Sequence, residues 1–434
     1  METTLTPEYS KTSTVWPMTI IGILFFIFGF VTWLNGSLIP FLKIICDLST
    51  FQALYVTLVF YIAYTVMALP ASWLLSKIGY KNGMAVGLAI MVVATLLFLP
   101  AAYQANYLFF LTGLFILGTG LTILQTAANP YLVILGPKES AAMRISIMGI
   151  VNKGAGVIVP LVFSAVILSD IGDASEQALL ALNEQELQAL SERLIIPYLY
   201  MAAVLTFLIG LVKFSPLPEI TPEPQQESDN KSGILQFPQV ILGAIALFAY
   251  VGVEVIAGDT IGLFGSSLGV DNFAILTSYT MAFMVLGYII GATCIPRYLS
   301  QTHALISSAI AGALCAISAA ISAVDSSSIS QLLWGFTSIP TIPNPVFFVA
   351  LMGLAHALVW PSIWPLALDG LGRFTAQGSA LLIMGISGGA LLPMVYGALA
   401  EITTEQSAYW VALPCYLFIL FYALKGHKMR QWRA

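Results

Sequence analysis

Charged residues are scarce in this sequence of 434 residues: Lys and Arg number 16, Asp and Glu number 21, and together they make up 9% of the chain. A soluble domain has about 25% charged residues, so these side chains are too few to cover a soluble body of this size. Apolar and aromatic residues make up 59%. The composition excludes a soluble globular protein and predicts a surface that faces a lipid bilayer.

Histidine and cysteine are also scarce, and basic residues form no interior stripe. With a net charge of −5, nucleic-acid binding is excluded. The three His form no close pair, and neither a metal-ligand spacing of cysteines nor an ATP-binding loop is found. We therefore expect neither an enzyme nor a bound cofactor. The cysteines are predicted to be packing residues without disulfides: Cys46, Cys294, Cys315 and Cys415.

Twelve stretches are long enough to cross the bilayer, because a helical span needs about 20 mostly apolar residues. The sequence therefore predicts an all-α membrane protein with twelve transmembrane helices. We expect the spans at roughly 17–41, 51–76, 82–102, 107–135, 145–168, 195–214, 238–264, 273–296, 303–324, 345–369, 376–400 and 407–425.

The distribution of Lys and Arg predicts that both ends of the chain are cytoplasmic. This orientation places thirteen of the sixteen basic residues on the cytoplasmic side, as the positive-inside rule requires. Only Lys43 and Arg193 then lie outside, and Lys153 lies within the fifth span. Removing one span would invert every later loop and destroy the asymmetry, so the distribution also supports the count of twelve.

The chain divides into two similar halves. A shift of 236 residues places "ILGPKESAAMRISIMGI" on "GLGRFTAQGSALLIMGI" in the same orientation, which indicates parallel repeats. A Pro-rich polar segment between the halves is typical of a flexible linker. We expect two six-helix pseudo-symmetric bundles, organised as a cytoplasmic tail at 1–16, an N-terminal bundle at 17–214, a cytoplasmic linker at 215–237, a C-terminal bundle at 238–425 and a cytoplasmic tail at 426–434.

Three motifs, in the first, fourth and seventh spans, carry a family resemblance: "FGFVTWLNGSLIPFLK", "QTAANPYLVILGP" and "YVGVEVIAGDTIGLF". They are similar to the fucose/glucose/galactose branch of the major facilitator superfamily, the bacterial sugar:cation symporters. The loop "LLSKIGYKNG" after span two resembles the hallmark loop of that superfamily in a degenerate form. The resemblance covers nearly all of the chain and implies the major facilitator fold.

One departure from the branch bears on the coupling ion. Fucose:proton members carry an acid directly after the Asn of the first-span motif and another before the Thr-Ala-Ala-Asn-Pro run, where this chain has Gly36 and Gln125. The resemblance therefore implies coupling through other residues or another ion. Members of the glucose/galactose type, several of them described as sodium-driven, share the Asn-Gly form.

Ionisable side chains deep in the spans are the first functional candidates, because a charge at the bilayer centre costs at least about 2.5 to 3.5 kcal/mol. They are Lys153, Glu254, Asp259 and His356. We predict that Glu254 is the coupling carboxylate and that Asp259 assists as a ligand or gate, which makes both candidate sodium ligands. A solvated position of Asp259 near the outer mouth is the alternative.

Lys153 requires a partner if it is buried, and Glu254 across the interface between the halves is the candidate. An arriving cation would release Glu254 from Lys153 and so link ion occupancy to the way the halves meet. The alternative is that Lys153 extends to the cytoplasmic headgroups, about 13 Å away at the level of Arg144.

Three spans are predicted to bend. Gly252 and Gly258 allow span seven to bend or unwind around its two carboxylates. Pro130 in span four and Pro361 and Pro365 in span ten remove backbone hydrogen bonds within apolar helices.

A sugar site needs amides that donate and accept hydrogen bonds, and an aromatic face for stacking. The resemblance places sugar contacts at Gln125 and Asn152, and we favour a sugar contact for His356 over a pH sensor or a structural bridge. Lipid-facing or interfacial packing is expected of Trp33 more than of Trp360. The candidate substrate-binding residues are Asn35, Gln125, Asn129, Asn152, Lys153, His356, Trp360 and Trp364.

Residues at the cytoplasmic ends of the spans are predicted to close that side as charge latches, with ordinary solvated loop charges as the alternative. The candidate gating residues are Gly79, Lys81, Glu139, Arg144, Asp369 and Arg373.

The twelve spans and the buried charges together with the family resemblance imply a monomeric secondary transporter of the bacterial inner membrane that imports a neutral hexose with a cation, sodium first and a proton second. Its partners would be the sugar, the cation and the lipid bilayer. An amino sugar such as N-acetylglucosamine is an alternative cargo. A membrane sugar sensor without transport is the alternative from another class.

Overall fold

The computed structural model describes residues 15–135, 141–169, 175–219, 233–295, 298–371 and 374–432. Twelve helical segments in these ranges are long and apolar enough to cross a membrane, which confirms the predicted count. All regular secondary structure in these ranges is helical, so the all-α prediction is also confirmed. The four cysteines are free, as expected.

The first six spans are built from ten helices. Span one consists of two helices in line, span two is preceded by a single turn, and two short helices lead into span six. The bounds are α1 Val15–Trp33, α2 Asn35–Ile45, α3 Thr50–Ala53, α4 Tyr55–Ile78, α5 Tyr80–Tyr103, α6 Tyr107–Ile134, α7 Ala141–Ile167, α8 Glu176–Leu180, α9 Glu184–Glu192 and α10 Ile195–Lys213.

The last six spans follow a short 3-10 turn, and several of them are interrupted. The bounds are η2 Ile234–Gln236, α11 Pro238–Asp259, α12 Ile261–Ser267, η3 Phe273–Ile275, α13 Leu276–Cys294, α14 Gln301–Ile321, α15 Ser328–Trp334, α16 Asn344–His356, α17 Val359–Leu368, α18 Thr375–Met384, η5 Gly385–Ser387, α19 Gly388–Ile402, α20 Glu405–Ala408, η6 Tyr409–Val411, α21 Ala412–Leu424 and η7 Gly426–Lys428.

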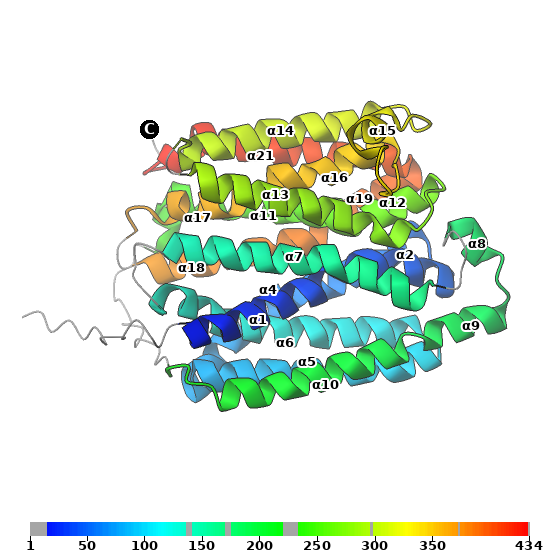
Figure 1. The fold of residues 1–434 in the computed structure, drawn as a ribbon. Coiled ribbons are helices and arrows are strands. Elements are labelled where there is room, and N and C mark those ends of the chain that lie inside the picture. Colours follow the sequence, from blue (N-terminus) through cyan, green and yellow to red (C-terminus); the bar gives the residue numbers. More distant parts are fainter. Residues whose placement is uncertain are drawn as a thin grey trace, which may run out of the picture.

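The long helices lie side by side, with the first half in the lower part of Figure 1 and the second half in the upper part. Helix α7 of the first half packs against α13 of the second, and α4 packs against α19. The start of α1 and the carboxyl end of the chain lie at the same end of the bundle, here called the terminal end; the opposite end, with α8, α9 and α12, is the distal end (Figure 1).

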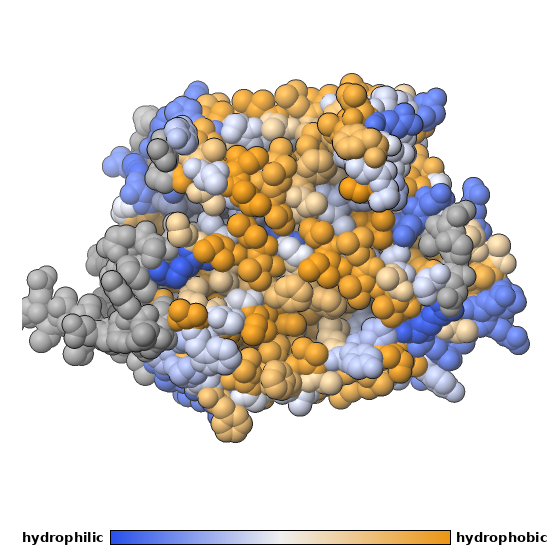
Figure 2. Space-filling model, in the orientation of Figure 1, coloured by the Kyte–Doolittle hydropathy of each residue, from blue (hydrophilic) through white to orange (hydrophobic). Residues whose placement is uncertain are grey.

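Apolar side chains cover the middle of the molecule, while hydrophilic residues gather at its two ends (Figure 2). This banded surface is what a bilayer requires, because its hydrocarbon region cannot hydrogen-bond polar groups. The large exposed side chains include Leu69, Phe207 and Leu314, which are 80%, 69% and 60% exposed. Such exposure of apolar residues fits a membrane protein.

Several spans are interrupted, and three of the interruptions lie near candidate site residues. Span one turns at Leu34, between α1 and α2. Span seven is interrupted at Thr260, whose hydroxyl donates to the Ile256 carbonyl at 2.7 Å. Span ten breaks between α16 and α17, four residues before Pro361, which is where a proline ring clashes with the preceding turn. The predicted bend of span ten is therefore confirmed, whereas α6 continues as one helix.

Close packing within the first half depends on a glycine. A Cβ at Gly29 of α1 would lie 1.9 Å from the carbonyl oxygen of Asn152 on α7. The two helices therefore meet backbone to backbone, a distance that every other residue would increase.

We expect Gly29→Ala to destabilise the protein by about 1 to 3 kcal/mol, because overpacking forces α1 and α7 apart. Gly154→Ala on α7 is the matched control, since a Cβ there meets nothing within 4 Å. The control is expected to be neutral or slightly stabilising. Thermal unfolding of the detergent-purified variants measures both, and equal melting temperatures would contradict the packing argument.

Candidate functional site

A buried ion pair joins the two halves. Lys153 on α7 donates from Nζ to Oε1 of Glu254 on α11 at 2.6 Å, and the two side chains are only 11% and 9% exposed. A charge-assisted hydrogen bond of this length is strong, and each charge offsets the desolvation of the other. The predicted pairing across the interface is confirmed, and the alternative that Lys153 reaches the headgroups is wrong.

Trp33 forms the third side of this site. The Lys153 ammonium lies 4.3 Å from the centre of the Trp33 ring, within the range of a cation–π contact. Trp33 is 2% exposed and packs with Met281, Met284 and Tyr288 of α13. The expectation of a lipid-facing or interfacial Trp33 is therefore wrong; the side chain lies between the halves.

Asp259 is fully buried at the end of α11. Its Oδ2 accepts a hydrogen bond from the Thr57 hydroxyl of α4 at 3.3 Å, while Oδ1 is buried without a hydrogen-bond partner. The alternative of a solvated Asp259 is wrong in this structure. Asp259 is thus a second carboxylate at the interface between the halves, one oxygen of which is available to a ligand.

Helix α11 does not unwind between its two carboxylates. It continues through Gly252 and Gly258 to Asp259, and the interruption falls at Thr260. The glycines instead allow close approach, since a Cβ at Gly252 would lie 2.1 Å from Leu392 Cδ1. The helix is thus not unwound between the carboxylates: Gly252 admits Leu392 of α19 in the same half, Gly258 admits Trp33 of the other half, and the interruption of span seven follows directly after Asp259.

Gly36 lies against the second half. A Cβ there would be 2.2 Å from Thr277 Oγ1 and 2.8 Å from the carbonyl oxygen of Gly258, and Thr277 donates to that carbonyl at 2.8 Å. No room is left for an acidic side chain at position 36. The departure from the proton-coupled motif is therefore built into the packing between the halves.

A cluster of aromatic side chains lies next to the ion pair. One of them, Tyr250, precedes Glu254 by one turn of α11. The Tyr250 ring centre is 6.0 Å from that of His356 and 6.3 Å from that of Trp360, which in turn lies 5.6 Å from Trp364. The His356 Nε2 is 2.6 Å from the Tyr416 hydroxyl, and its Nδ1 is buried without a partner. These rings and polar atoms suit a ligand with hydroxyls around an apolar face.

The four candidate amides occupy different places. Gln125 on α6 donates to the Tyr64 hydroxyl at 3.1 Å, and Asn152 donates to the Phe25 carbonyl at 3.3 Å. Asn35, at the start of α2, is 1% exposed and its Nδ2 has no hydrogen-bond partner. Asn129 is exposed, close to the terminal end of α6. Their roles as sugar contacts stay predictions.

The described gating candidates lie at the terminal end. Gly79 has a φ of 80° and leads into α5, where the Lys81 ammonium donates to the Ser215 carbonyl at 2.7 Å and the Lys81 amide donates to Glu219 at 3.2 Å. Arg144 is buried and donates to the Leu132 carbonyl at 2.7 Å. These contacts stay within the first half and the segment that follows it.

Asp369 pairs with Arg430 near the carboxyl end of the chain. The two other gating candidates, Glu139 and Arg373, lie outside the described residues. The proposed exchange of charge pairs among these positions therefore stays a prediction.

Hydrogen bonds join the halves at the distal end. Glu176 of α8 accepts from Ser266 of α12 and also pairs with Lys43 at 3.4 Å. Further bonds run from Ser37 to the Ala274 carbonyl (2.7 Å), from Thr50 to Glu405 (3.0 Å), from the Phe51 amide to Glu401 (3.2 Å) and from Ser164 to Asn272 (2.6 Å). The distal ends of the bundles are therefore held together.

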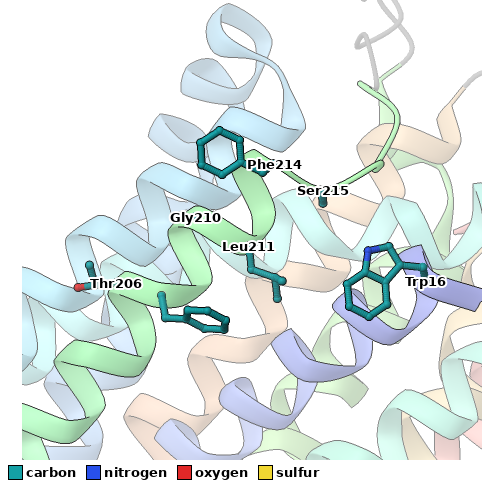
Figure 3. Close-up of a pocket in the computed structure, with 7 residues that line it drawn as sticks. Trp16, Thr206, Gly210, Leu211, Phe214 and Ser215 are labelled. Carbon is teal, nitrogen blue, oxygen red and sulfur yellow. The ribbon is translucent and has the colours of Figure 1, made fainter.

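A hollow of about 440 Å³ on the outside of the bundle is a different feature. It is lined by residues of α10 and by Trp16 at the terminal end (Figure 3). The lining includes Phe207, Leu211 and Phe214, so the hollow is largely apolar and contains none of the candidate site residues. It offers a sugar no hydrogen-bonding set like that around Lys153.

Thr57, Tyr250 and Tyr416 contact the candidate site but were not singled out by the sequence. Hydroxyl-bearing residues are common in apolar spans, so no local pattern distinguishes them. Trp33 had one usable signal in the sequence: it lies within the first-span motif, two residues before Asn35.

Twelve spans in two halves, with an ion pair buried between them, define a class of multi-pass transport proteins. Residues 21–393 match the Major Facilitator Superfamily. The chain belongs to the Major Facilitator Superfamily.

Curated relatives fall in the predicted branch. The chain is 33% identical to a glucose/galactose transporter of Brucella abortus, over 95% of this chain and 94% of that protein. It is 32% identical to a putative glucose/galactose transporter of Helicobacter pylori (97% and 99% covered) and 28% identical to the L-fucose-proton symporter of Escherichia coli (94% and 92% covered). The resemblance found in the motifs is confirmed.

A solved structure supports the fold. The crystal structure of the E. coli fucose:proton symporter FucP superposes with a TM-score of 0.69 at 24% identity, covering 95% of this chain and 98% of that one. The predicted major facilitator fold is confirmed.

The ion pair predicts a specific pattern of stability. Lys153→Met or Glu254→Gln alone leaves one uncompensated buried charge, which costs about 3 to 5 kcal/mol. The double variant should recover most of that loss, because no lone charge remains. Thermal unfolding of the three purified variants measures the coupling.

The exposed pair of Asp369 and Arg430 provides the control, with side chains 67% and 48% exposed. Breaking this pair should cost less than about 1 kcal/mol. Additive losses for Lys153→Met and Glu254→Gln would contradict a coupled buried pair.

Proposed function

We propose that this protein imports a neutral hexose of the glucose/galactose type by symport with a cation, sodium in the first place, across the bacterial inner membrane. The hexose is suggested by the relatives with the higher identity, which are named glucose/galactose transporters. The observation that carries the transport mechanism is the Lys153–Glu254 pair between the halves.

The mechanism follows from the electrostatics of that pair. A cation that reaches Glu254 competes with the Lys153 ammonium for the same carboxylate, so occupancy weakens the contact between α7 and α11. Asp259, with its free Oδ1 five residues further along the unbroken α11, lies on a different face of the helix from Glu254 and would assist as a gate or a secondary ligand. Loading therefore changes how the two halves meet, which is the requirement for alternating access.

The sugar is proposed to bind between the halves, beside the ion pair. The rings of Trp360 and Trp364 provide a stacking face, and the amides of Gln125 and Asn152 provide hydrogen bonds from the first half. His356 adds a buried ring nitrogen without a partner. The site would thus be complete only when both halves contribute.

We rank sodium above the proton as the coupling ion because this chain has Gly36 and Gln125 at the positions where the proton-coupled members of the branch carry acids. A proton is the second candidate, since the relatives include an L-fucose-proton symporter. Both ions would act at Glu254, so the geometry of the pair accommodates either.

Transport in proteoliposomes tests the proposal. We expect labelled glucose or galactose to accumulate under an inward sodium gradient and to exchange without it. Uptake that responds to a pH gradient alone would assign the proton instead. Accumulation of N-acetylglucosamine but not of the hexoses would change the cargo, and binding without exchange would support a sensor.

Glu254→Gln is expected to abolish concentrative uptake while some downhill exchange is retained, because the cation loses its carboxylate. Glu184→Gln, a change of an exposed carboxylate on α9, is the matched control and should accumulate sugar normally. Full concentrative uptake by Glu254→Gln would remove Glu254 from the coupling mechanism.

A further inference from the structure

The Lys153 ammonium touches two different partners. One is the Glu254 carboxylate at 2.6 Å, and the other is the face of Trp33, whose ring centre lies at 4.3 Å. A coupling cation would compete with Lys153 for the carboxylate. The face of the indole ring cannot be titrated and would not be occupied by the coupling cation. When a cation binds, Lys153 would therefore lose its contact with Glu254 and retain its contact with Trp33.

The indole is held rigidly between the two halves. A Cβ at Gly156 of α7 would lie 2.7 Å from Trp33 Cδ1, and one at Gly258 of α11 would lie 2.4 Å from Trp33 Cζ3. One glycine from each half thus admits the ring, and Met281 packs beside it. Trp33 also ends α1, directly before the interruption at Leu34.

The polar atom of the ring does not explain this placement. Trp33 Nε1 is buried and has no hydrogen-bond partner, so the indole is not fixed by a hydrogen bond. What the ring presents to Lys153 is its π face, the part that attracts a cation. In a buried site of low dielectric constant this attraction is stronger than at a surface.

We propose that Trp33 is a positioning residue for coupling: it holds the charged Lys153 side chain at the interface while a cation occupies Glu254. This inference rests on the proposed function. An ammonium that loses its carboxylate in a low-dielectric site is strongly destabilised. The Trp33 face already contacts Lys153 in the paired state, and it is the partner that remains to the ammonium once a cation takes Glu254. The contact therefore stabilises the loaded state more than the paired one, and this difference increases the affinity for the cation without Trp33 touching the cation or the sugar.

The test lowers the electron density of the indole ring and leaves its shape almost unchanged. Tryptophans carrying one to four fluorines are incorporated at position 33 of the full chain, and each fluorine weakens the π face further. We expect the cation concentration for half-maximal hexose uptake in proteoliposomes to rise step by step, by about tenfold over the series. Hexose counterflow at saturating cation should stay unchanged.

Trp73 provides the matched control. Its ring is 63% exposed and lies 6.0 Å from the Lys77 ammonium, so it is a surface cation–π pair of the same residue types. The same fluorinated series at position 73 should leave the half-maximal cation concentration unchanged, because Trp73 and Lys77 do not contact Lys153 or Glu254.

Two substitutions add an independent measurement. Trp33→Phe retains a weaker π face and should raise the half-maximal cation concentration less than Trp33→Leu does. If the leucine variant fails to fold, the fluorinated series still decides the question.

A flat fluorinated series at position 33, in a protein whose uptake is driven by a cation, would overturn the role of Trp33 and leave the proposed function intact. A protein whose hexose transport responds to neither sodium nor pH would overturn both.

Discussion

The buried pair of Lys153 and Glu254 is the interaction on which the arrangement of the two halves depends. Each half carries one of the two charges within an apolar span, and in the described part of the chain they neutralise each other across the interface. The bundles must therefore meet there for either charge to be tolerated in the membrane. The same dependence makes the contact sensitive to any ion that competes for the carboxylate.

Three of the helix interruptions lie in the same spans as the site. Trp33 and Asn35 flank the turn in span one, Asp259 precedes the turn in span seven, and His356 ends α16 in span ten. An interruption frees backbone groups and reorients side chains, and both are tolerated in a membrane only where they face protein or a polar pathway. The distal hydrogen bonds hold the halves together beyond these turns.

Much of this architecture follows from local features of the sequence. The number of spans follows from the number of apolar stretches that are long enough to cross the bilayer. The Lys153–Glu254 pair was predictable because few ionisable side chains lie within the spans, so each had few possible partners. The continuity of α11 and the burial of Trp33 were not predictable. A glycine serves equally as a hinge or as a close contact, and at Gly252 and Gly258 the choice depends on Leu392 and Trp33, which come from distant segments. Asp259 likewise meets Thr57 from the other half.

Gly36 has an evolutionary consequence. Because Thr277 and the Gly258 carbonyl fill the space beside it, an acid at position 36 would collide with an existing hydrogen bond rather than enter open space. A lineage that exchanges the carboxylate-free form of the motif for the acidic one must first, or at the same time, replace Thr277 by a smaller residue or move α13. The acidic form of the motif therefore requires a different contact between α2 and α13, and not the exchange of Gly36 alone.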